Sequence, residues 1–336
     1  MSDGRPVDLT HFGLAVGHAT DEPGATGLTV VRGLEGPLRG AAAVVGRATG
    51  TRELATLAPR HLADRVDALL LTGGSSYGLD AAAGAMRWLE ERGRGFPVGA
   101  GVVPIVPAAV VFDLAPLGRF DARPTAAMAY AAAHEASATG VAEGSVGAGT
   151  GTTVGKGAGP AGAMKGGVGI ATAGGEEARV AAIAVVNAFG DVRDGEGRIL
   201  AGARNADGGF ADTQAVVAGG GGTQRFGDMT MRNTTLAVVA TSVPVSRLAL
   251  EQIARAATAA LYRRITPAGT TFDGDVVFAL CPWGDGADDG VAAARAGAAP
   301  PSLALEALAT LALERAIERG VRTARGRDGI PGLADA

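Results

Sequence analysis

Short apolar runs alternate with longer alanine-rich stretches along most of the chain. The apolar runs are brief, partly β-branched and bounded by glycine, which is typical of strands. The alanine-rich stretches repeat apolar residues at helical spacing, as at Leu250, Ile253, Ala257 and Leu261. This mixture predicts a layered α/β fold. The expected strands are 27–31, 41–45, 68–72, 182–186, 235–240 and 275–280, and the expected helices are 79–92, 125–137, 247–264 and 303–319.

One segment breaks this pattern. Residues 205–232 are rich in Gly, Asp, Gln and Thr and show little periodicity. They predict a long surface loop or linker, and a loop of this length inside a compact protein is usually functional or disordered. The loop ends where a buried strand is expected to begin, at Thr234.

Composition and charge exclude several classes of protein. The chain has 336 residues, enough for two domains or one large α/β domain, and 47% hydrophobic with 19% charged residues is typical of a folded protein. A net charge of −4 without a basic block argues against a nucleic-acid partner. The longest apolar stretch, 102–117, is interrupted by Pro104, Pro107 and Asp113, so we expect no membrane span. A single cysteine, Cys281, and the lack of an export signal favour the cytoplasm.

Glycine accounts for 54 residues and gathers in the run GAGTGTTVGKGAGPAG at 147–162. A phosphate-binding P-loop would need glycine at 150 and Ser or Thr at 157, where the chain has Thr150 and Gly157. A dinucleotide fingerprint fits 157–162 in spacing, but no apolar strand precedes it and Pro160 interrupts it. We therefore expect no nucleotide cofactor, and glycines that permit close backbone approach. Lys156 within this run would, taken alone, be a solvated surface group.

Histidine chemistry is also disfavoured. The four histidines show no metal-ligand spacing, and no G-x-S-x-G motif accompanies them. The sequence therefore predicts neither a zinc site nor a Ser-His-Asp triad.

Five ordered motifs carry a family resemblance. They are GGSSYGLDAAAG (73–84), VPAAVVFDL (106–114), GAGTGTTVGKGAG (147–159), RNTTLAVVATS (232–242) and TPAGTTFDGDVVFAL (266–280). Together they resemble the DmpA family (peptidase family S58) of self-cleaving amidohydrolases, from about residue 10 to 319. This family includes the DmpA-type aminopeptidases, the β-peptidyl aminopeptidases and the endo-type nylon-oligomer hydrolases. The Asn-Thr-Thr junction resembles the nylon-oligomer branch more than the Gly-Ser junction of the other two.

The resemblance implies a fold and a maturation step. The fold would be a four-layer α/β/β/α sandwich of N-terminal-nucleophile type. The precursor would be cut between Asn233 and Thr234 into an α-chain (1–233, ending in a Gly-rich linker at about 203–233) and a β-chain (234–336) of one composite domain. Thr234 would be the nucleophile, and its freed α-amine would be the tethered base that a threonine hydroxyl needs. Thr235 would be a structural neighbour.

The resemblance also assigns further site residues. Lys156 matches the family's active-site lysine, whose cation would lower the hydroxyl pKa or keep the amine neutral. Asp273 and Asp275 match the paired aspartates of D-G-D, and alternation along an extended chain would put both on one side. An Asx-Gly turn is the alternative reading of this pair. Asn187 matches an asparagine whose amide donates to an oxyanion.

The match departs from the family at Phe112, where some relatives carry a tyrosine whose hydroxyl assists the oxyanion site. We expect Tyr77 to be a structural or pocket-lining residue, with a substitute donor as the alternative. No metal or cofactor is implied, and family members assemble into homotetramers or larger oligomers of αβ heterodimers.

The activity that the resemblance implies is hydrolysis of a linear amide through an acyl-threonine. Exo-acting aminopeptidase or β-peptidyl aminopeptidase activity, acyl transfer to an amine, and a degenerate member without activity stay open at this point.

Overall fold

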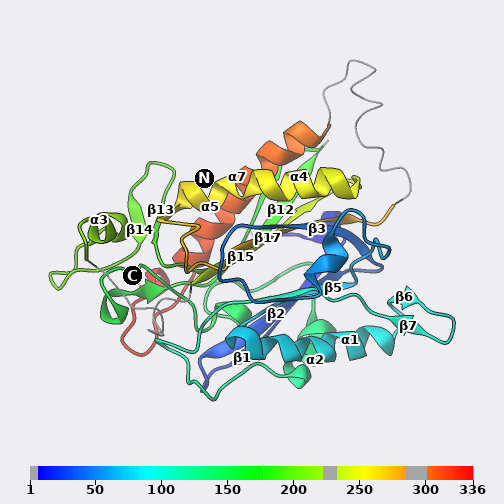
Figure 1. Ribbon diagram of the computed structural model, residues 1–336, viewed down its shortest axis with the longest axis horizontal. Coiled ribbons are helices and arrows are strands. Elements are labelled where there is room, and N and C mark those ends of the chain that lie inside the picture. Colours follow the sequence, from blue (N-terminus) through cyan, green and yellow to red (C-terminus); the bar gives the residue numbers. More distant parts are fainter. Residues whose placement is uncertain (1–6, 177, 222–232, 285–300, 336) are drawn as a thin grey trace.

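Two five-stranded sheets lie face to face between two layers of helices (Figure 1). The computed structural model describes residues 7–176, 178–221, 233–284 and 301–335. Three apolar cores separate the four layers, one between the sheets and one between each sheet and its helices. The predicted α/β/β/α sandwich is therefore confirmed.

The first sheet has the strand order β1-β2-β5-β8-β4, and only its β5–β8 pair is parallel. The helices α1 and α2 pack on its outer face, at the bottom of Figure 1. These elements are β1 (Leu14–Asp21), β2 (Thr26–Gly33), β4 (Thr51–Arg52), β5 (Ala68–Thr72), β8 (Ala108–Val110), α1 (Ala82–Glu90) and α2 (Ala126–Glu135).

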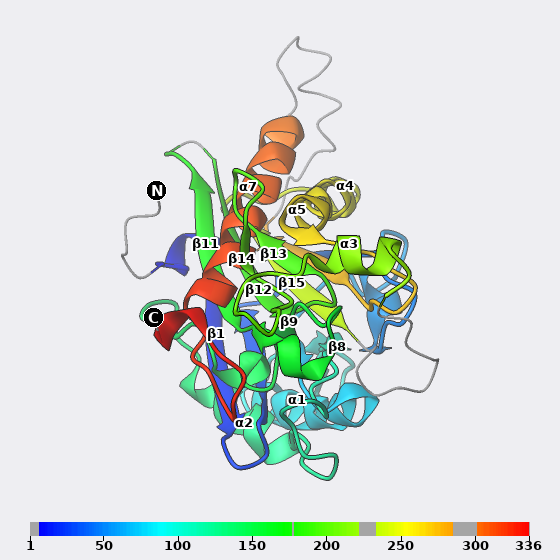
Figure 2. The ribbon, with the colours of Figure 1, turned by 90° about the vertical axis from the view of Figure 1, so that its left-hand side faces the viewer.

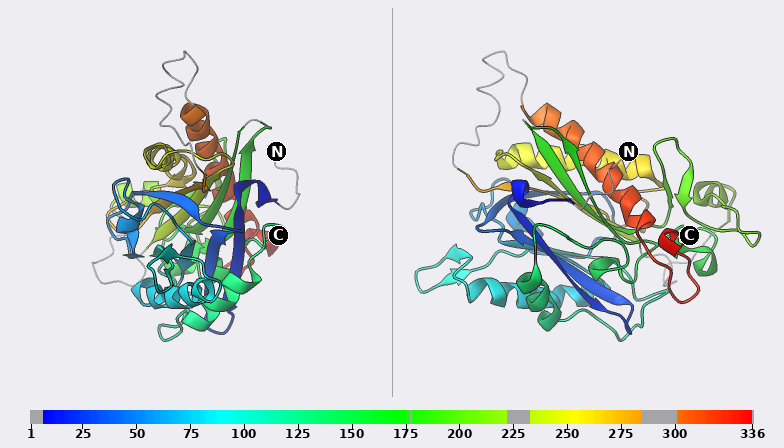
Figure 3. Two further views of the ribbon diagram at one scale, coloured as in Figure 1. Left: turned by 90° about the vertical axis from the view of Figure 1, so that its right-hand side faces the viewer. Right: turned by 180° about the vertical axis from the view of Figure 1, so that it is seen from behind.

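The second sheet has the order β11-β12-β15-β17-β3, and its β15–β17 pair is parallel. The helices α4, α5 and α7 cover its outer face, with α7 running across the strands (Figures 2 and 3). None of the helices in the described ranges is long and apolar enough to cross a membrane. These elements are β3 (Leu38–Val44), β11 (Val168–Gly174), β12 (Arg179–Asn187), β15 (Thr234–Thr241), β17 (Val276–Pro282), α4 (Arg247–Ala257), α5 (Ala259–Arg264) and α7 (Pro301–Arg322).

Smaller elements connect the layers. They are the pair β9 (Thr153–Val154) and β10 (Met164–Lys165), the pair β6 (Phe96–Pro97) and β7 (Val102–Val103), the three strands β13 (Asp191–Arg193), β14 (Ile199–Ala201) and β16 (Ile265–Thr266), the helix α3 (Thr213–Ala218), and the 3-10 turns η1 (Thr10–Phe12), η2 (Leu54–Leu57), η3 (Ser75–Ala81), η4 (Gly147–Gly149), η5 (Pro160–Gly162) and η7 (Leu333–Asp335).

Strand β15 shows why the central strands appear in the sequence as unbroken apolar runs. Every residue of this strand is buried. Ala237 and Val239 face the helix layer, whereas Leu236 and Val238 face the other sheet. A strand buried on both faces needs no polar alternation.

Three sequence predictions need correction. The expected helix 79–92 begins as the 3-10 turn η3 and continues as α1. The expected helix 247–264 is two helices divided at Thr258. The expected loop 205–232 contains α3, because the Asp212 side chain caps the backbone N–H groups of Gln214 and Ala215. Residues 222–232 of that loop lie outside the described residues.

Candidate active site

The register of the second sheet brings five predicted site residues to one place. Asn187 ends β12 directly opposite Thr234, which begins β15. Asn233, one residue earlier, bridges to Asp273, and Asp275 immediately precedes β17. Residues from three distant parts of the sequence thus meet at one end of the neighbouring strands β12, β15 and β17.

Lys156 enters this cluster from the glycine-rich run. Its backbone N–H donates to Phe189 O at 2.9 Å, just beyond the end of β12. Gly155 before it has a φ of 68°, and a Cβ there would lie 2.0 Å from the carbonyl carbon of Gly202. Only glycine permits this approach, which confirms close backbone contact as the purpose of a glycine here. Lys156 is 2% exposed, so it is not a surface residue.

The ammonium group of Lys156 lies among uncharged oxygen acceptors. Its Nζ donates to Asn233 Oδ1 at 2.7 Å, Asn187 Oδ1 at 3.1 Å, Ala188 O at 3.1 Å and Asn187 O at 3.4 Å. Burial lowers the pKa of Lys156 to about 7, and the negative charge of Asp273 opposes that shift. Lys156 therefore gains or loses its proton near neutral pH.

Asn187 is fixed on both ends of its amide. Its Oδ1 also accepts the backbone N–H of Thr153 at 3.1 Å, and its Nδ2 donates to Phe112 O at 3.0 Å. Phe112 is buried, and its backbone carbonyl orients Asn187 by accepting this hydrogen bond. The amide has a second N–H, so it can still donate to a reacting oxygen.

The carbonyl oxygen of the peptide bond before Thr234 accepts two hydrogen bonds. Thr234 Oγ1 lies 2.6 Å from the Asn233 carbonyl oxygen, to which it donates. The same oxygen accepts the backbone N–H of Gly274 at 2.8 Å. A Cβ at Gly274 would lie 2.7 Å from both Thr234 Oγ1 and Ala48 O. Gly274, which the sequence did not single out as functional, is the donor placed where negative charge would develop.

The paired aspartates are both buried. Asp275 Oδ1 accepts the Thr235 N–H at 2.6 Å, and Asp273 Oδ2 accepts the Thr270 N–H at 2.7 Å. Burial, reinforced by the neighbouring Asp273, raises the pKa of Asp275 to about 8. Burial also raises the pKa of Asp273, while bonds from Thr270 and the charge of Lys156 oppose that rise. Asp273 thus accepts from the turn that precedes it, which is not the bond of an Asx-Gly turn, and its charge also acts on Lys156.

Tyr77 lies apart from this cluster, whereas the hydroxyl of Thr235 lies beside it without joining it. Tyr77 is 52% exposed, and its described ring contacts are with Phe120 and with the guanidinium of Arg123. The structure therefore gives no support to Tyr77 as a donor. Thr235 is buried in β15, and its Oγ1 has no hydrogen-bond partner among the described residues.

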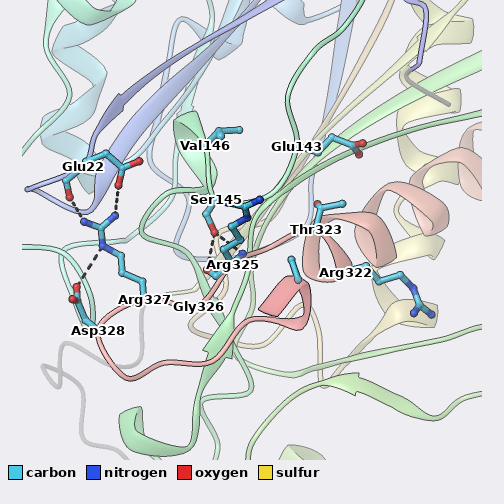
Figure 4. A pocket seen from close by; sticks show the side chains of 11 residues that line it. Glu22, Glu143, Ser145, Val146, Arg322, Thr323, Arg325, Gly326, Arg327 and Asp328 are labelled. Carbon is cyan, nitrogen blue, oxygen red and sulfur yellow. Dashed lines mark hydrogen bonds and ion pairs between the residues drawn. The ribbon is translucent and has the colours of Figure 1, made fainter. Parts of the chain in front are cut away.

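A pocket of about 820 Å³ lies elsewhere, between the turn of the first hairpin at Glu22, the segment 143–146 and the segment after α7 (Figure 4). Arg327 crosses it to reach Glu22 and Asp328, at 2.7 and 3.4 Å. None of its lining residues belongs to the cluster around Thr234. In the described ranges, no group of three or more His, Cys, Asp or Glu side chains could hold a metal ion.

Sequence reasoning missed a second buried lysine, Lys165 in β10. Its Nζ donates to the carbonyl oxygens of Gly149, Thr150 and Thr152 at 2.8–3.1 Å. These bonds hold the loop that leads to Thr153, and the backbone N–H of Thr153 in turn donates to Asn187 Oδ1. Burial lowers the pKa of Lys165 to about 7, and Arg327 adds to this shift. One signal could have found it, because Lys156 and Lys165 are the two lysines among 30 basic residues.

The model of peptidase family S58 matches residues 10–333. The chain belongs to this family. An uncharacterized aminopeptidase of Mycobacterium tuberculosis (strain ATCC 25618 / H37Rv) is 42% identical over 319 residues, covering 93% of this chain and 90% of that protein. A 6-aminohexanoate-oligomer endohydrolase of Kocuria sp. (strain KY2) is 31% identical over 300 residues, covering 83% and 76%.

The fold agrees with this membership. The l-aminopeptidase d-ala-esterase/amidase of Ochrobactrum anthropi, described as a variant of the Ntn-hydrolase fold, superposes with a TM-score of 0.67 at 18% identity, covering 96% of this chain and 87% of that one. The S58 chain is thus an amide hydrolase of the peptidase class with that architecture. The junction motif resembles the nylon-oligomer branch, whereas identity over the whole chain is higher to the aminopeptidase.

Proposed function

We propose that this S58 protein is a self-activating amide hydrolase with Thr234 as its N-terminal nucleophile. The observation that carries this proposal is the pair of contacts on the Asn233 carbonyl oxygen. The Thr234 hydroxyl reaches it at 2.6 Å and the Gly274 N–H at 2.8 Å. The nucleophile and an oxyanion donor therefore converge on one peptide bond before that bond is cut.

Self-cleavage begins with attack of Thr234 Oγ1 on the carbonyl carbon of Asn233. The C–N bond breaks, the nitrogen takes the hydroxyl proton, and an ester joins Asn233 to Thr234. Water then hydrolyses the ester, which leaves a carboxylate on Asn233 and restores the hydroxyl. Gly274 stabilises the oxygen that becomes negative in both steps.

Substrate hydrolysis uses the same hydroxyl with a new base. The freed α-amine of Thr234 takes the hydroxyl proton and passes it to the leaving amine of the substrate. Lys156 lies in the same buried cluster, and its positive charge favours the neutral, basic form of that amine. Ionised Asp273 limits this effect because its negative charge favours the protonated amine, whereas the raised pKa of Asp275 keeps that carboxyl neutral up to about pH 8.

The substrate class we propose is a linear amide or short peptide. Two names among the relatives support it, an aminopeptidase and a 6-aminohexanoate-oligomer endohydrolase. Acyl transfer to an amine would use the same nucleophile with another acceptor. A member that folds without cutting is the competing class, and the phenylalanine at Phe112 is the departure that favours it.

N-terminal sequencing of any small fragment tests this function. We expect Thr-Thr-Leu-Ala-Val, beginning at Thr234, together with release of amine from amide substrates by the processed protein. A chain that hydrolyses amides while wholly intact would contradict the proposal, and so would a fragment that begins at another residue.

A further inference from the structure

Asn233 fills a defined position beside the nucleophile. The residue is 1% exposed, and its Oδ1 accepts the shortest of the Lys156 hydrogen bonds, at 2.7 Å. Its Nδ2 is buried without a hydrogen-bond partner among the described residues. A polar side chain is thus held by a single strong interaction inside the site, although a buried amide without full partners is costly.

In the proposed self-cleavage, Asn233 is also the acyl group of an intermediate. The ester formed when Thr234 attacks is an acyl-enzyme whose acyl group is Asn233. An external substrate forms the same kind of ester on the same oxygen. The acyl half of the site therefore has to accept an asparagine residue in one of its two reactions.

We propose that Asn233 is the template of the acyl subsite, so that the enzyme prefers amides whose acyl residue carries a carbonyl or carboxylate oxygen on its γ-carbon. Asparagine is the preferred residue, and Lys156 is the specificity-determining contact. This inference rests on the proposed function. Leucine has the same branched shape without the acceptor, and a 6-aminohexanoyl group lacks an acceptor on its γ-carbon.

The expected preference follows from the hydrogen bond that Lys156 loses when the acyl residue has no γ-carbonyl oxygen. Without the γ-carbonyl oxygen, its remaining described acceptors are Asn187 O, Asn187 Oδ1 and Ala188 O, all at 3.1 Å or longer. A hydrogen bond to a charged group contributes about 1.5–3 kcal/mol, which corresponds to roughly 10–100-fold. We expect kcat/KM to differ by at least about tenfold between acyl residues with and without the acceptor.

The intermolecular test compares L-asparagine p-nitroanilide with L-leucine p-nitroanilide on processed wild-type protein. The asparagine compound should have the higher kcat/KM by at least about tenfold, and free L-asparagine should inhibit more strongly than free L-leucine. Equal values, or a preference for leucine, would overturn the subsite. Failure to hydrolyse either compound would instead count against the proposed function.

The intramolecular test needs no external substrate. Asn233→Asp keeps the acceptor and should self-cleave within a few-fold of the wild-type rate, whereas Asn233→Leu should be slower by at least about tenfold. As a control, the melting temperatures of both variants are measured in the Thr234→Val background, which we expect to stay uncleaved. Similar melting temperatures would show that a slower cleavage rate comes from the lost contact and not from a lost fold. Equal cleavage rates for Asp and Leu in folded protein would overturn the inference and leave self-cleavage itself established.

Discussion

Lys156 shows how burial changes what a side chain does. Its position in a glycine-rich run, taken alone, predicted a solvated surface group. In the structure its ammonium satisfies buried oxygens of Asn187, Ala188 and Asn233. Removing it leaves those acceptors without their donor, which costs about 1–3 kcal/mol. Lys156 therefore contributes to the fold, besides the role that we propose for it in the chemistry.

We expect Lys156→Ala to lower turnover by on the order of 10²–10³, because a charge near the reacting atoms is lost. We also expect a lower melting temperature. Steady-state kinetics and thermal unfolding measure the two effects, with exposed Arg87→Ala as the control. Near-normal turnover in a folded Lys156→Ala protein would return this lysine to a structural role.

The α-amine of Thr234 predicts a pH dependence of turnover. A free α-amine titrates near 7.7–8.0, and it acts as a base only after losing its proton. We therefore expect kcat/KM on a non-ionising amide to rise with pH through about 7 to 8. Lys156 pushes this pKa down while it is protonated, and ionised Asp273 pushes it up, whereas Asp275 stays neutral up to its own pKa of about 8.

Histidines are the natural alternative base, and the structure argues against one of them directly. Burial lowers the pKa of His18 to about 4, so this ring stays neutral throughout the range. Replacing each of the four histidines by glutamine should leave the rise with pH in place. Loss of the rise and of activity in one such variant, with self-cleavage retained, would make that histidine the base.

Asp275 predicts a pH dependence of stability. Its pKa is raised from 3.8 to about 8 by burial, so the folded protein favours the neutral acid. The stability that this preference contributes is complete below pH 3.8 and is lost as pH rises to about 8. Asn at this position keeps an acceptor for the Thr235 N–H and does not titrate.

Thermal unfolding of Asp275→Asn, in the Thr234→Val background, checks this linkage. The melting temperature of the variant relative to its parent should increase between pH 4 and pH 8. A difference that stays constant over that range would show that Asp275 is charged in the folded protein.

At the scale of elements, the two predicted chains are interleaved. The β-chain would contribute the neighbouring strands β15 and β17, which lie between β12 and β3 of the α-chain. Helix α7 of the β-chain also packs over β11 and β12. Cleavage before Thr234 therefore breaks one peptide bond and leaves the sheet and its core intact.

We accordingly expect the two fragments to stay together after cleavage. On a denaturing gel they should run at about 23 and 10 kDa, in the ratio of 233 to 103 residues of the 33.1 kDa chain. On size exclusion without denaturant they should elute as one species. Separation of the fragments in native buffer would contradict this strand order.

Elements with local signals were predictable from the sequence. Residues 68–72 form β5 as expected, and β15 and β17 follow unbroken apolar runs. The helix α3 was missed because its signal is a single capping residue, Asp212. The two-residue strand β9 has too few residues to show a period.

At the scale of the whole molecule, the site is made by chain segments that meet only in three dimensions. The family motifs located Thr234, Lys156, Asn187 and the aspartates, and the sheets bring these residues together. Gly274 was missed because its contribution is a backbone N–H, which no side-chain pattern reveals. Lys165 was missed because its three partners are backbone carbonyls.

A matched pair of substitutions on β15 tests the central claim most directly. Thr234→Val and Thr235→Val each replace a hydroxyl by a methyl group of similar size in neighbouring buried positions. Thr235 Oγ1 has no hydrogen-bond partner among the described residues, so its loss should be neutral for the fold. Thr234 Oγ1 is the proposed nucleophile.

The measurement is a denaturing gel of the two purified variants, followed by an amide-hydrolysis assay. We expect Thr235→Val to give two fragments and activity, and Thr234→Val to stay a single inactive chain that is folded, as a cooperative melting transition would show, although it lacks the hydrogen bond to Asn233 O. Cleavage and turnover by folded Thr234→Val protein would contradict the account, because another residue would then have to be the nucleophile.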